Sequence, residues 1–385
     1  MIGTIVISGS MAQKPCQGGH ASVFLQYILG FRKLGWDVLF LDQLEQNMCV
    51  DSQGNPCALE ESVNLHSFVR IMKDFDLDGR YALICDHGER FIGLTRQEVL
   101  ARTSSAALLL NVMGFLKDPE ILDRAQNRAF LDIDPGFGQM WQELGLCEMF
   151  TGHHHYVTIG ENIGRSDCTI PTCDLSWITT RQPVLLDYWR MDGTSQCASF
   201  TSIASWRGAY GPVPFQGKTY GLRAHEFRKF AGLPTVADQQ FELALDIHSA
   251  DAADRLLLEK SGWMLADPRS VAGSPRTYRN YIQSSGAEFM IAKNMYVDTR
   301  CGWFSDRSIC YLASGKPVLA QDTGLRNLYP TGPGLLKFSS MEEAVSGVQQ
   351  ISKDYGTHSL AARTLAAELF DSDKVLTRLL QKLNV

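Results

Sequence analysis

The stretch from Thr299 to Leu325 constrains the fold more than any other part of this sequence, because signals for a loop, a helix, a turn and a strand follow one another directly. Ser305 or Asp306 can accept hydrogen bonds from the free amides at the start of a helix. Gly315 supplies the left-handed residue that ends this helix, and residues 317–320 then predict a short apolar strand. A helix that leads directly into a buried strand is typical of an α/β domain.

The start of this helix is a candidate anion site. Gly302 lets the backbone turn sharply just before it, and unpaired N–H groups together with the helix dipole favour negative charge there. Arg300 and Arg307 flank the helix start, and Ser305 and Ser308 add hydroxyl groups. We therefore predict that it binds a phosphate or a diphosphate. The alternative is an ordinary capped helix with two solvated arginines.

The beginning of the chain predicts a second ligand-binding edge. Residues 4–8 predict a buried strand, residues 17–20 a glycine loop, and the next segment a helix that Gly35 ends before another strand. This β-loop-α-β unit is typical of a doubly wound parallel sheet. Gly19 and His20 lie at the carboxyl end of the first strand, where such sheets hold their ligands.

The length of the chain indicates more than one domain. With 385 residues, two α/β domains of roughly 150 to 200 residues are the natural partition. We place the linker in the segment rich in Thr, Pro and Cys at 163–182, ahead of an apolar strand predicted at 184–186. The predicted units are residues 1–178, residues 179–365 and a last helix over residues 366–385.

Charge and cysteine content restrict the partners and the compartment. A net charge of −6 and a pI near 5.9 argue against a general binder of nucleic acid or of anionic membranes. Ten scattered cysteines, several inside apolar runs, fit reduced thiols in a cytoplasmic protein. The chain begins without the basic flank of a signal peptide, and no run reaches the ~18 apolar residues of a membrane span. We therefore predict a cytoplasmic protein with no stable membrane insertion and no nucleic-acid partner, and leave its oligomeric state open.

Two segments resemble GT-B glycosyltransferases. Residues 300–305, Arg-Cys-Gly-Trp-Phe-Ser, followed by a helix, Ala-Ser-Gly-Lys-Pro-Val and Gln-Asp, resemble the nucleotide-sugar signature of family 1. Residues 18–38 look like the corresponding N-terminal segment of that family, and the whole pattern is similar to bacterial GT-B proteins. Two departures stand out: the family's leading His is Arg300 here, and its ribose-binding Glu falls on Cys310, with Asp306 as the nearest substitute.

The resemblance implies an α/β fold of two doubly wound Rossmann-like domains that face each other across a cleft. The C-terminal helix would cross back to the first domain. The resemblance also implies that the N-terminal domain binds a small-molecule or glycan acceptor and that the C-terminal domain binds a nucleotide-sugar donor. This donor is a co-substrate, and neither a further cofactor nor a metal is expected.

The family's general base falls on His20 in this resemblance. A neutral imidazole suits that role when a carboxylate orients it and stabilises the imidazolium that forms. The family places this carboxylate at the end of a strand in the same domain, on Asp132 or Asp134 here, with Asp86 in reserve. Spacing does not decide between them. An alternative for Asp134 is a helix cap ahead of Pro135.

Further donor contacts are predicted in the C-terminal half. Arg207 and Lys218 follow a strand and a Gly/Pro loop in the order of the phosphate-binding Arg and Lys of GT-B family 4, a looser resemblance. Glu288 and Lys293 are two charges in an apolar strand, so they either pair with each other or face the cleft. Asp322 matches the acidic residue that holds sugar hydroxyls in the family.

A zinc site is the remaining chemical alternative. His153, His154 and His155, with Cys168 and Cys173 downstream, are ligand types that zinc accepts. However, the cysteine spacing is not that of a common zinc finger, and consecutive histidines cannot all face one ion. We therefore predict no metal site.

Together these features predict a hexosyltransferase that moves a sugar from a nucleotide-diphosphate donor to a hydroxyl group, with inversion at the anomeric carbon. One alternative is a nucleotide-sugar 2-epimerase on the same scaffold, which would act on the donor without an acceptor. Another is a non-catalytic GT-B protein that binds a nucleotide or a glycan, because one fold hosts many activities. The missing ribose-binding Glu favours this last alternative.

Overall fold

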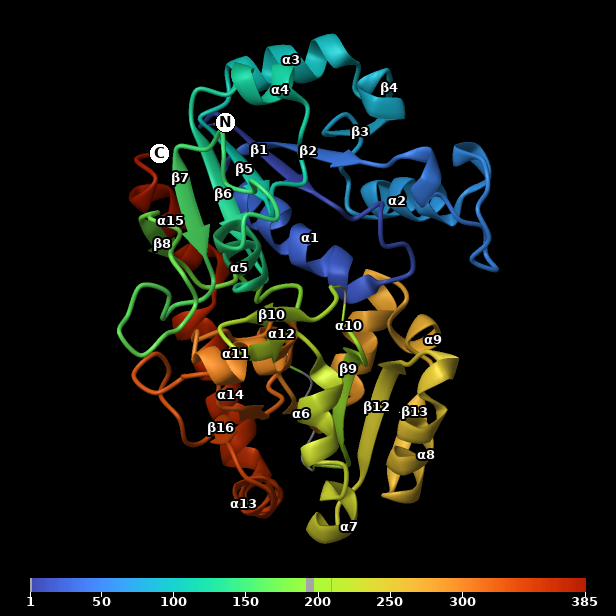
Figure 1. The fold of residues 1–385 in the computed structure, drawn as a ribbon, viewed down its shortest axis with the longest axis vertical. Helices are drawn as coiled ribbons and strands as arrows, with labels where there is room; N and C mark the ends of the chain where they lie inside the picture. The colour runs from blue at the N-terminus through green and yellow to red at the C-terminus, as the bar shows by residue number, and fades with distance from the viewer. Residues whose placement is uncertain (1, 192–196, 209) are drawn as a thin grey trace.

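The chain forms two sheets, each covered by helices on both faces, which lie one above the other in Figure 1. The computed structural model describes residues 2–191, 197–208 and 210–385. This architecture confirms the predicted α/β class with two doubly wound, Rossmann-like sheets.

The first sheet has eight strands among the described residues, in the order β4-β3-β2-β1-β5-β6-β7-β8. All neighbours are parallel except β3 and β4. The strands are β1 (Thr4–Gly9), β2 (Asp37–Gln43), β3 (Tyr81–Cys85), β4 (Arg90–Gly93), β5 (Leu108–Val112), β6 (Arg128–Asp132), β7 (His155–Thr158) and β8 (Trp177–Thr179). The helical segments between them are α1 (Gly18–Lys33), η1 (Gln46–Met48), η2 (Leu59–Glu61), α2 (Val63–Asp74), η3 (Asp86–Gly88), α3 (Arg96–Ser104), α4 (Pro119–Arg124) and α5 (Phe137–Glu143).

The second sheet has six parallel strands within the described part of the chain, in the order β13-β12-β9-β14-β15-β16. They are β9 (Phe200–Ser205), β12 (Phe241–Asp246), β13 (Trp263–Ala266), β14 (Ala287–Met290), β15 (Val318–Gln321) and β16 (Leu335–Phe338). A separate antiparallel hairpin consists of β10 (Val213–Phe215) and β11 (Lys218–Tyr220). The helical segments are α6 (Arg223–Lys229), α7 (Leu233–Ala237), η4 (Ser249–Asp251), α8 (Ala252–Lys260), α9 (Pro268–Ala272), α10 (Pro275–Ser284), α11 (Asn294–Thr299), α12 (Asp306–Ala313), α13 (Met341–Lys353), α14 (Tyr355–Leu369) and α15 (Ser372–Lys382).

Successive residues of the first sheet face opposite helix layers. On β1, Ile5 and Ile7 pack into the core shared with α1, α2 and α15, whereas Val6 packs into the core shared with α3 and α4. Both faces of the sheet are therefore dry, which explains why its strands are nearly continuous apolar runs in the sequence.

The predicted strand at 184–186 does not join either sheet. Val184 forms a single bridge with Asp371, and its N–H donates to the Phe370 carbonyl at 2.7 Å. The second sheet begins at β9 instead, so the segment after β8 is a connection. An apolar run alone could not distinguish these two cases. The domain limits at residues 178 and 365 stay predictions.

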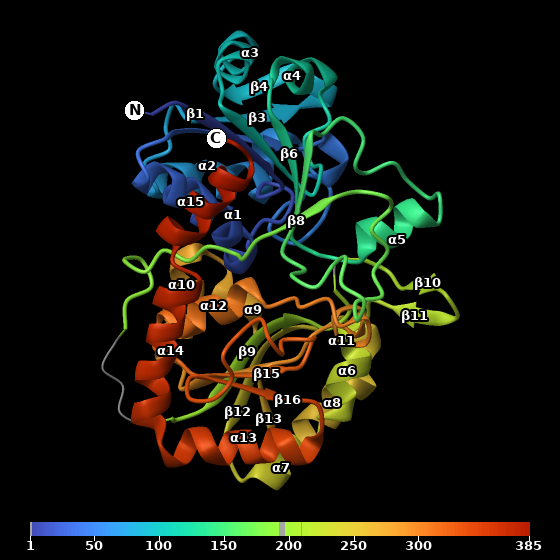
Figure 2. The ribbon, with the colours of Figure 1, turned by 90° about the vertical axis from the view of Figure 1, so that its left-hand side faces the viewer.

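The last helix returns to the first sheet, as the sequence predicted. Figure 2 shows α14 and α15 running along one side from the lower half to the upper half. Leu376 of α15 is fully buried and lies over Gly30 of α1, where an added methyl group would come within 2.5 Å of the Leu376 Cδ1 atom. This close approach fixes the end of the chain on α1. Among the described residues, no helix combines the length and the apolar character that crossing a bilayer requires.

Replacing Leu376 with Ala should lower the free energy of unfolding by about 2 to 5 kcal/mol, because the change leaves a cavity between α15 and α1. Urea unfolding measures this loss. Leu360→Ala is the matched control, since Leu360 is 63% exposed and its loss should change stability by less than about 0.5 kcal/mol. Equal effects in the two variants would show that α15 is not anchored through Leu376.

Candidate functional site

Loops that follow strands of both sheets meet at one place. Asp134 follows β6 of the first sheet and Lys293 follows β14 of the second, and their side chains are in contact. Parallel α/β sheets hold their ligands at the carboxyl ends of their strands. We call the ionisable side chains that gather here the cross-sheet cluster; its members are Lys14, His20, Asp134, Arg223, Lys293, Tyr296 and Asp306.

Asp134 joins the two halves of the cross-sheet cluster. Its carboxylate accepts hydrogen bonds from the Lys293 Nζ atom at 2.8 and 3.0 Å, and one more from the Tyr296 hydroxyl. The side chain of Lys293 is 8% exposed and that of Asp134 is 20% exposed, so the ion pair is largely shielded from solvent. Asp134 is not a helix cap, because the residue before α5 is Gly136. The capping alternative for Asp134 is therefore wrong.

The three cations of the cluster, Lys14, Arg223 and Lys293, outnumber its two carboxylates, Asp134 and Asp306. Burial lowers the pKa of Lys14; Asp134 opposes this shift and Lys293 adds to it. Burial likewise lowers the pKa of Lys293, with Asp134 opposing, and burial together with nearby Arg307 lowers the pKa of Arg223 to about 10. The Nε atom of Arg223 is buried and has no hydrogen-bond partner among the described residues. A bound anion would stabilise all three charges.

Sequence reasoning missed Lys14, Arg223 and Tyr296. Tyr296 follows Lys293 by three positions, and Lys293 is the residue directly before the short helix α11. Arg223 begins α6 directly after the β10-β11 hairpin, and Lys14 lies in the loop after β1. Only the i, i+3 spacing of Tyr296 was readable in advance. The other two reach the cluster through tertiary packing.

Helix α12 begins where the sequence predicted, at Asp306, and the Ser305 Oγ atom accepts a hydrogen bond from the Arg307 N–H at 3.2 Å. Burial raises the pKa of Asp306 although Arg307 and Arg223 are close to it. The helix start thus offers N–H groups with a carboxyl beside them. Such a carboxyl accepts hydrogen bonds from hydroxyl groups and repels phosphate.

Arg307 spans two strands of the second sheet. Its guanidinium donates to Glu288 at 2.5 Å and to the Ile203 carbonyl at 2.6 Å, and Ser308 beside it is fully buried. Burial raises the pKa of Glu288, and Arg307 opposes this shift. The alternative in which Glu288 pairs with Lys293 is therefore wrong. That Arg307 and Ser308 bind a diphosphate stays a prediction. Arg307 would first have to break its ion pair with Glu288.

Gly19 and Gly302 allow close packing near the site. A methyl group at Gly19 would lie 3.0 Å from the ring of Tyr278. Gly302 has a φ of +74°, and a methyl group there would lie 2.6 Å from the Leu328 Cδ1 atom and 3.0 Å from Asn162. Close packing alone explains why glycine occupies both positions. That either glycine contacts a ligand stays a prediction.

His20 lies in the first turn of α1 and is partly buried. Its Nε2 atom is 3.0 Å from the Ser10 carbonyl oxygen and 3.1 Å from the Ser10 Oγ atom. Because a carbonyl oxygen only accepts hydrogen bonds, Nε2 carries the proton and Nδ1 holds the lone pair. Burial and the nearby Lys14 lower the pKa of His20 to about 3, so the imidazole is neutral at physiological pH.

No carboxylate is hydrogen-bonded to His20 within the described part of the chain. Asp132 is buried and accepts instead from Gln139 at 2.7 Å and from the Thr158 hydroxyl at 2.8 Å. Burial raises the pKa of Asp132 to about 6. Asp132 and Asp134 thus have other partners in this structure, and the role of either as the partner of His20 stays a prediction.

Arg207 and Lys218 lie at the edge of the site. Arg207 is exposed and makes two hydrogen bonds with Asp251, at 2.7 and 2.8 Å, and Lys218 is exposed on β11. The neighbouring Gly208 is close to the cluster, since a methyl group there would lie 3.6 Å from the Cε atom of Lys293. Donor binding by these two cations stays a prediction, and Arg207 would have to leave Asp251.

Arg300 and Asp322 complete the predicted set. Arg300 is exposed and holds a left-handed backbone with a φ of +52°. Asp322 accepts from Lys337 at 2.6 Å and from two backbone N–H groups at 2.9 Å. Burial would raise the pKa of Asp322, but these hydrogen bonds hold it below its usual range. Asp322 is therefore a charged carboxylate whose oxygens are already partly occupied.

The histidines considered for zinc have other partners. His153 lies between the Asn111 amide at 3.0 Å and the Phe150 carbonyl at 3.1 Å, and His154 contacts Arg128. In residues 2–191, 197–208 and 210–385, no group of three or more His, Cys, Asp or Glu side chains is placed to hold a metal ion.

Solved structures share this fold over nearly the whole chain. An α-glucosyltransferase bound to UDP-glucose and to DNA containing an abasic site has a TM-score of 0.62 and 11% sequence identity, with 99% of each chain covered. Sucrose-phosphate synthase from Thermosynechococcus elongatus has a TM-score of 0.54 and 11% identity, with 99% of this chain and 98% of that chain covered. HepE from Anabaena, bound to UDP, has a TM-score of 0.54 and 11% identity over 100% of both chains. No protein-family model and no curated protein sequence matches this chain. The chain therefore has the GT-B fold, and the resemblance in the sequence is confirmed at the level of fold.

One prediction about partners is contradicted by these structures. The net charge of −6 argued against nucleic acid, yet α-glucosyltransferases with this fold are seen in complex with DNA that contains an abasic site, an A:G mismatch or an HMU base. Net charge averages over the whole surface, whereas phosphates are bound by local groups of cations. The exclusion of nucleic acid is therefore withdrawn.

The low pKa of His20 should make stability depend on pH. Between its ordinary pKa of 6.5 and about 3, the unfolded chain binds a proton that the folded chain does not, so stability should fall as the pH drops through this window. Urea unfolding at about pH 7 and about pH 5 should show a smaller fall for His20→Gln than for the unmodified protein. An identical pH dependence in both would mean that His20 titrates normally in the folded state.

Proposed function

We propose that this protein transfers a sugar from a nucleoside-diphosphate donor to an acceptor. The observation that carries the proposal is the cross-sheet cluster, in which Lys14, Arg223 and Lys293 are desolvated and share few anions. A diphosphate supplies the negative charge that such a group lacks. The UDP and UDP-glucose bound by proteins of the same fold support this choice of ligand.

The diphosphate would lie against Lys14, Arg223 and Lys293, with the ribose rather than the phosphates facing the Asp306 carboxyl at the start of α12. The Nε atom of Arg223 is buried and has no hydrogen-bond partner among the described residues, so it is a donor that a phosphate oxygen would satisfy. Asp306 would accept from ribose hydroxyls, in place of the family's Glu, and Asp322 from sugar hydroxyls. Arg207, Lys218 and Arg300 would contribute at longer range; the full proposed donor set is Gly19, Arg207, Lys218, Arg223, Lys293, Arg300, Gly302, Ser305, Asp306, Arg307, Ser308 and Asp322.

We further propose that the transfer inverts the anomeric carbon, with His20 as the base. The lone pair on Nδ1 is free to accept the acceptor proton. A pKa near 3 makes His20 a weak base in the free protein, because burial disfavours its charged form and, to a smaller extent, because Lys14 is close. A donor diphosphate that neutralises Lys14 would raise this pKa toward the range that general-base catalysis needs.

Neither a metal ion nor another cofactor is needed in this proposal. The positive charge that a divalent cation supplies in other sugar transferases would come from Lys14, Arg223 and Lys293. We also propose a cytoplasmic location, supported by the ten cysteines, all of which are free thiols.

Two acceptor classes are proposed. The sequence favours a small molecule or a glycan. The second class is nucleic acid, which α-glucosyltransferases of this fold hold in their complexes. Two assays distinguish a transferase, whichever acceptor it uses, from an epimerase and from a non-catalytic binding protein. Only an epimerase converts the donor sugar when no acceptor is present, and only a binder takes up UDP without any transfer.

Replacing Arg223 or Lys293 with Met should raise the Kd for UDP about 10- to 100-fold, because each change removes a charge-assisted hydrogen bond in a dry site. Calorimetry measures the Kd. Arg255→Gln is the control, since Arg255 is an exposed residue of α8 paired with Glu259 on the same helix. Unchanged UDP affinity in both Met variants would place the diphosphate elsewhere.

Replacing His20 with Ala should remove most turnover while leaving the Kd for UDP within about twofold, since His20 acts on the acceptor side. Turnover is followed by donor consumption, and the anomer of the product by NMR. Inversion together with an inactive His20→Ala variant supports the base assignment. Retention, or full activity of this variant, contradicts it while leaving the donor site in place.

A further inference from the structure

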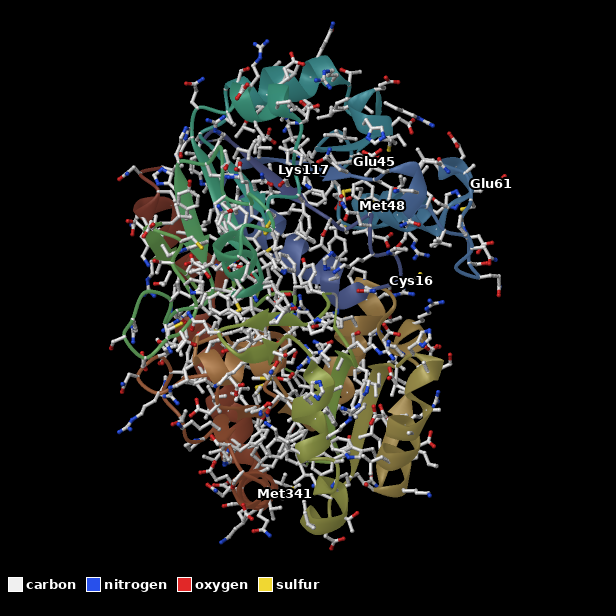
Figure 3. The ribbon with its side chains drawn as sticks, viewed as in Figure 1. Cys16, Glu45, Met48, Glu61, Lys117 and Met341 are labelled. Atoms are coloured by element: carbon white, nitrogen blue, oxygen red, sulfur yellow. The ribbon has the colours of Figure 1, made fainter. Side chains whose placement is uncertain are left out.

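A cavity of about 700 Å³, open to solvent on one side, lies between the N-terminal and C-terminal halves. It is lined by the loop after β1, by α2, by the connection between the sheets and by the segment from α9 to α10. Figure 3 shows Cys16, one of its lining residues, at the boundary between the N-terminal and C-terminal halves. The cavity is therefore bordered by both halves of the molecule, as the site itself is.

A tight backbone contact separates this cavity from the cluster. Cys16 lines the cavity, and His20 belongs to the cluster. Between them, Gly18 packs so closely on Ser274 that an added methyl group would lie 2.1 Å from the Ser274 carbonyl oxygen. The cavity and the cluster thus lie on either side of one short segment, residues 16–20. A phosphate bound in the cavity would therefore lie beside the site, and the rest of the molecule would have to extend past residues 16–20 to reach His20.

The lining of this cavity is strongly basic. Arg70, Arg269, Arg276 and Arg279 contribute to it, against one carboxylate, Asp74. We call these four residues the arginine group. They come from both halves of the molecule, since Arg70 is on α2 and the other three are on α9 and α10.

None of the four guanidinium groups makes an ion pair within 4.0 Å in residues 2–191, 197–208 and 210–385, although Arg269 is close enough to Asp267 to help lower the pKa of that carboxyl. Arginines elsewhere are commonly paired, as Arg228 is with Asp254 at 2.6 Å and Arg96 is with Asp118 at 3.0 Å. Arg279 stacks on the ring of Tyr188 at 4.3 Å, and its buried Nε atom lacks a hydrogen-bond partner. In a chain with a net charge of −6, four unpaired arginines around one cavity are not explained by a general excess of basic residues.

Helix α10 adds to the positive potential of the cavity. Its N-cap, Ser274, and its first residue, Pro275, both line the cavity, so the positive end of the helix dipole points there. Guanidinium groups bind phosphate oxygens through paired N–H donors, and they do so better than lysine. The cavity therefore has the chemistry of a phosphate site.

We propose that this cavity binds a phosphate ester carried by the acceptor. The inference rests on the proposed transferase function, because it assigns the phosphate to the second substrate. A phosphate held by the arginine group would place the rest of that molecule against the segment that leads to His20. The phosphate ester belongs either to a nucleic-acid strand or to a sugar phosphate, and the two sources are separated by experiment.

The test compares the unmodified protein with the triple variant Arg269→Gln, Arg276→Gln, Arg279→Gln. One probe is a fluorescent oligonucleotide, as single strand and as duplex, followed by anisotropy at two salt concentrations. The other is glucose 6-phosphate, followed by calorimetry. The triple variant should bind one of these probes at least about tenfold more weakly. Only nucleic-acid binding should weaken steeply with salt.

Two controls keep the outcome interpretable. Arg378→Gln removes an exposed arginine of α15 far from the cavity in sequence, and it should leave probe binding unchanged. Thermal unfolding checks that the triple variant is folded. The proposal is overturned if the unmodified protein binds neither probe, if the triple variant binds both as well as the unmodified protein does, or if Arg378→Gln weakens binding equally. UDP affinity is measured in parallel. Failure of the unmodified protein to bind UDP would count against the transferase proposal alone, whereas loss of UDP affinity in the triple variant would assign the arginine group to the donor and overturn this inference.

Discussion

The contact of Asp134 with Lys293 and Tyr296 is the interaction on which the site depends. It is the point at which a carboxylate from the first sheet meets a cation from the second in a place largely shielded from water. Removing two charges from water costs several kcal/mol per ion, and their attraction offsets this cost only with good geometry and further hydrogen bonds. The Tyr296 hydroxyl supplies such a bond. An ion pair between the two halves of the molecule therefore lies inside the candidate site.

This position has a consequence for ligand binding. The negatively charged carboxylate of Asp134 already neutralises part of the positive charge of the cluster. A phosphate group would interact with the same cations in the same way. A donor diphosphate would compete with Asp134 for Lys293, or would use the remaining capacity of Lys14 and Arg223. The buried, unpaired Nε atom of Arg223 favours binding through Lys14 and Arg223. This donor would gain a partner while the ion pair between Asp134 and Lys293 stays intact.

Local sequence signals predicted the parts of the site that local structure makes. The start of α12, predicted near Arg307 and found at Asp306, and its Ser305 cap could be predicted because capping acts within a few residues. The glycine loop predicted at residues 17–20 was wrong, because α1 already begins at Gly18. The ion pairs of the site could not be predicted from the sequence. Glu288 and Lys293 lie five positions apart, yet each pairs with a residue that the fold brings from elsewhere, Arg307 and Asp134. Similarly, the apolar run at 184–186 had the composition of a strand, and only the packing of α15 against the connection decided otherwise.

The binding partners were harder to predict than the fold, because anion binding depends on local groups of charges and not on the net charge of the chain. A net charge of −6 is a property of the whole surface, whereas a phosphate interacts with the few groups within a Debye length, about 10 Å at ordinary ionic strength. Most of the carboxylates that make this chain acidic are distant from the arginine group or paired with other cations, as Asp254 is with Arg228 and Asp118 with Arg96. What decides anion binding is which cations are left without such a partner. That distribution depends on the fold, because Arg70 and Arg279 lie in different halves of the chain and share a cavity only after the halves pack together.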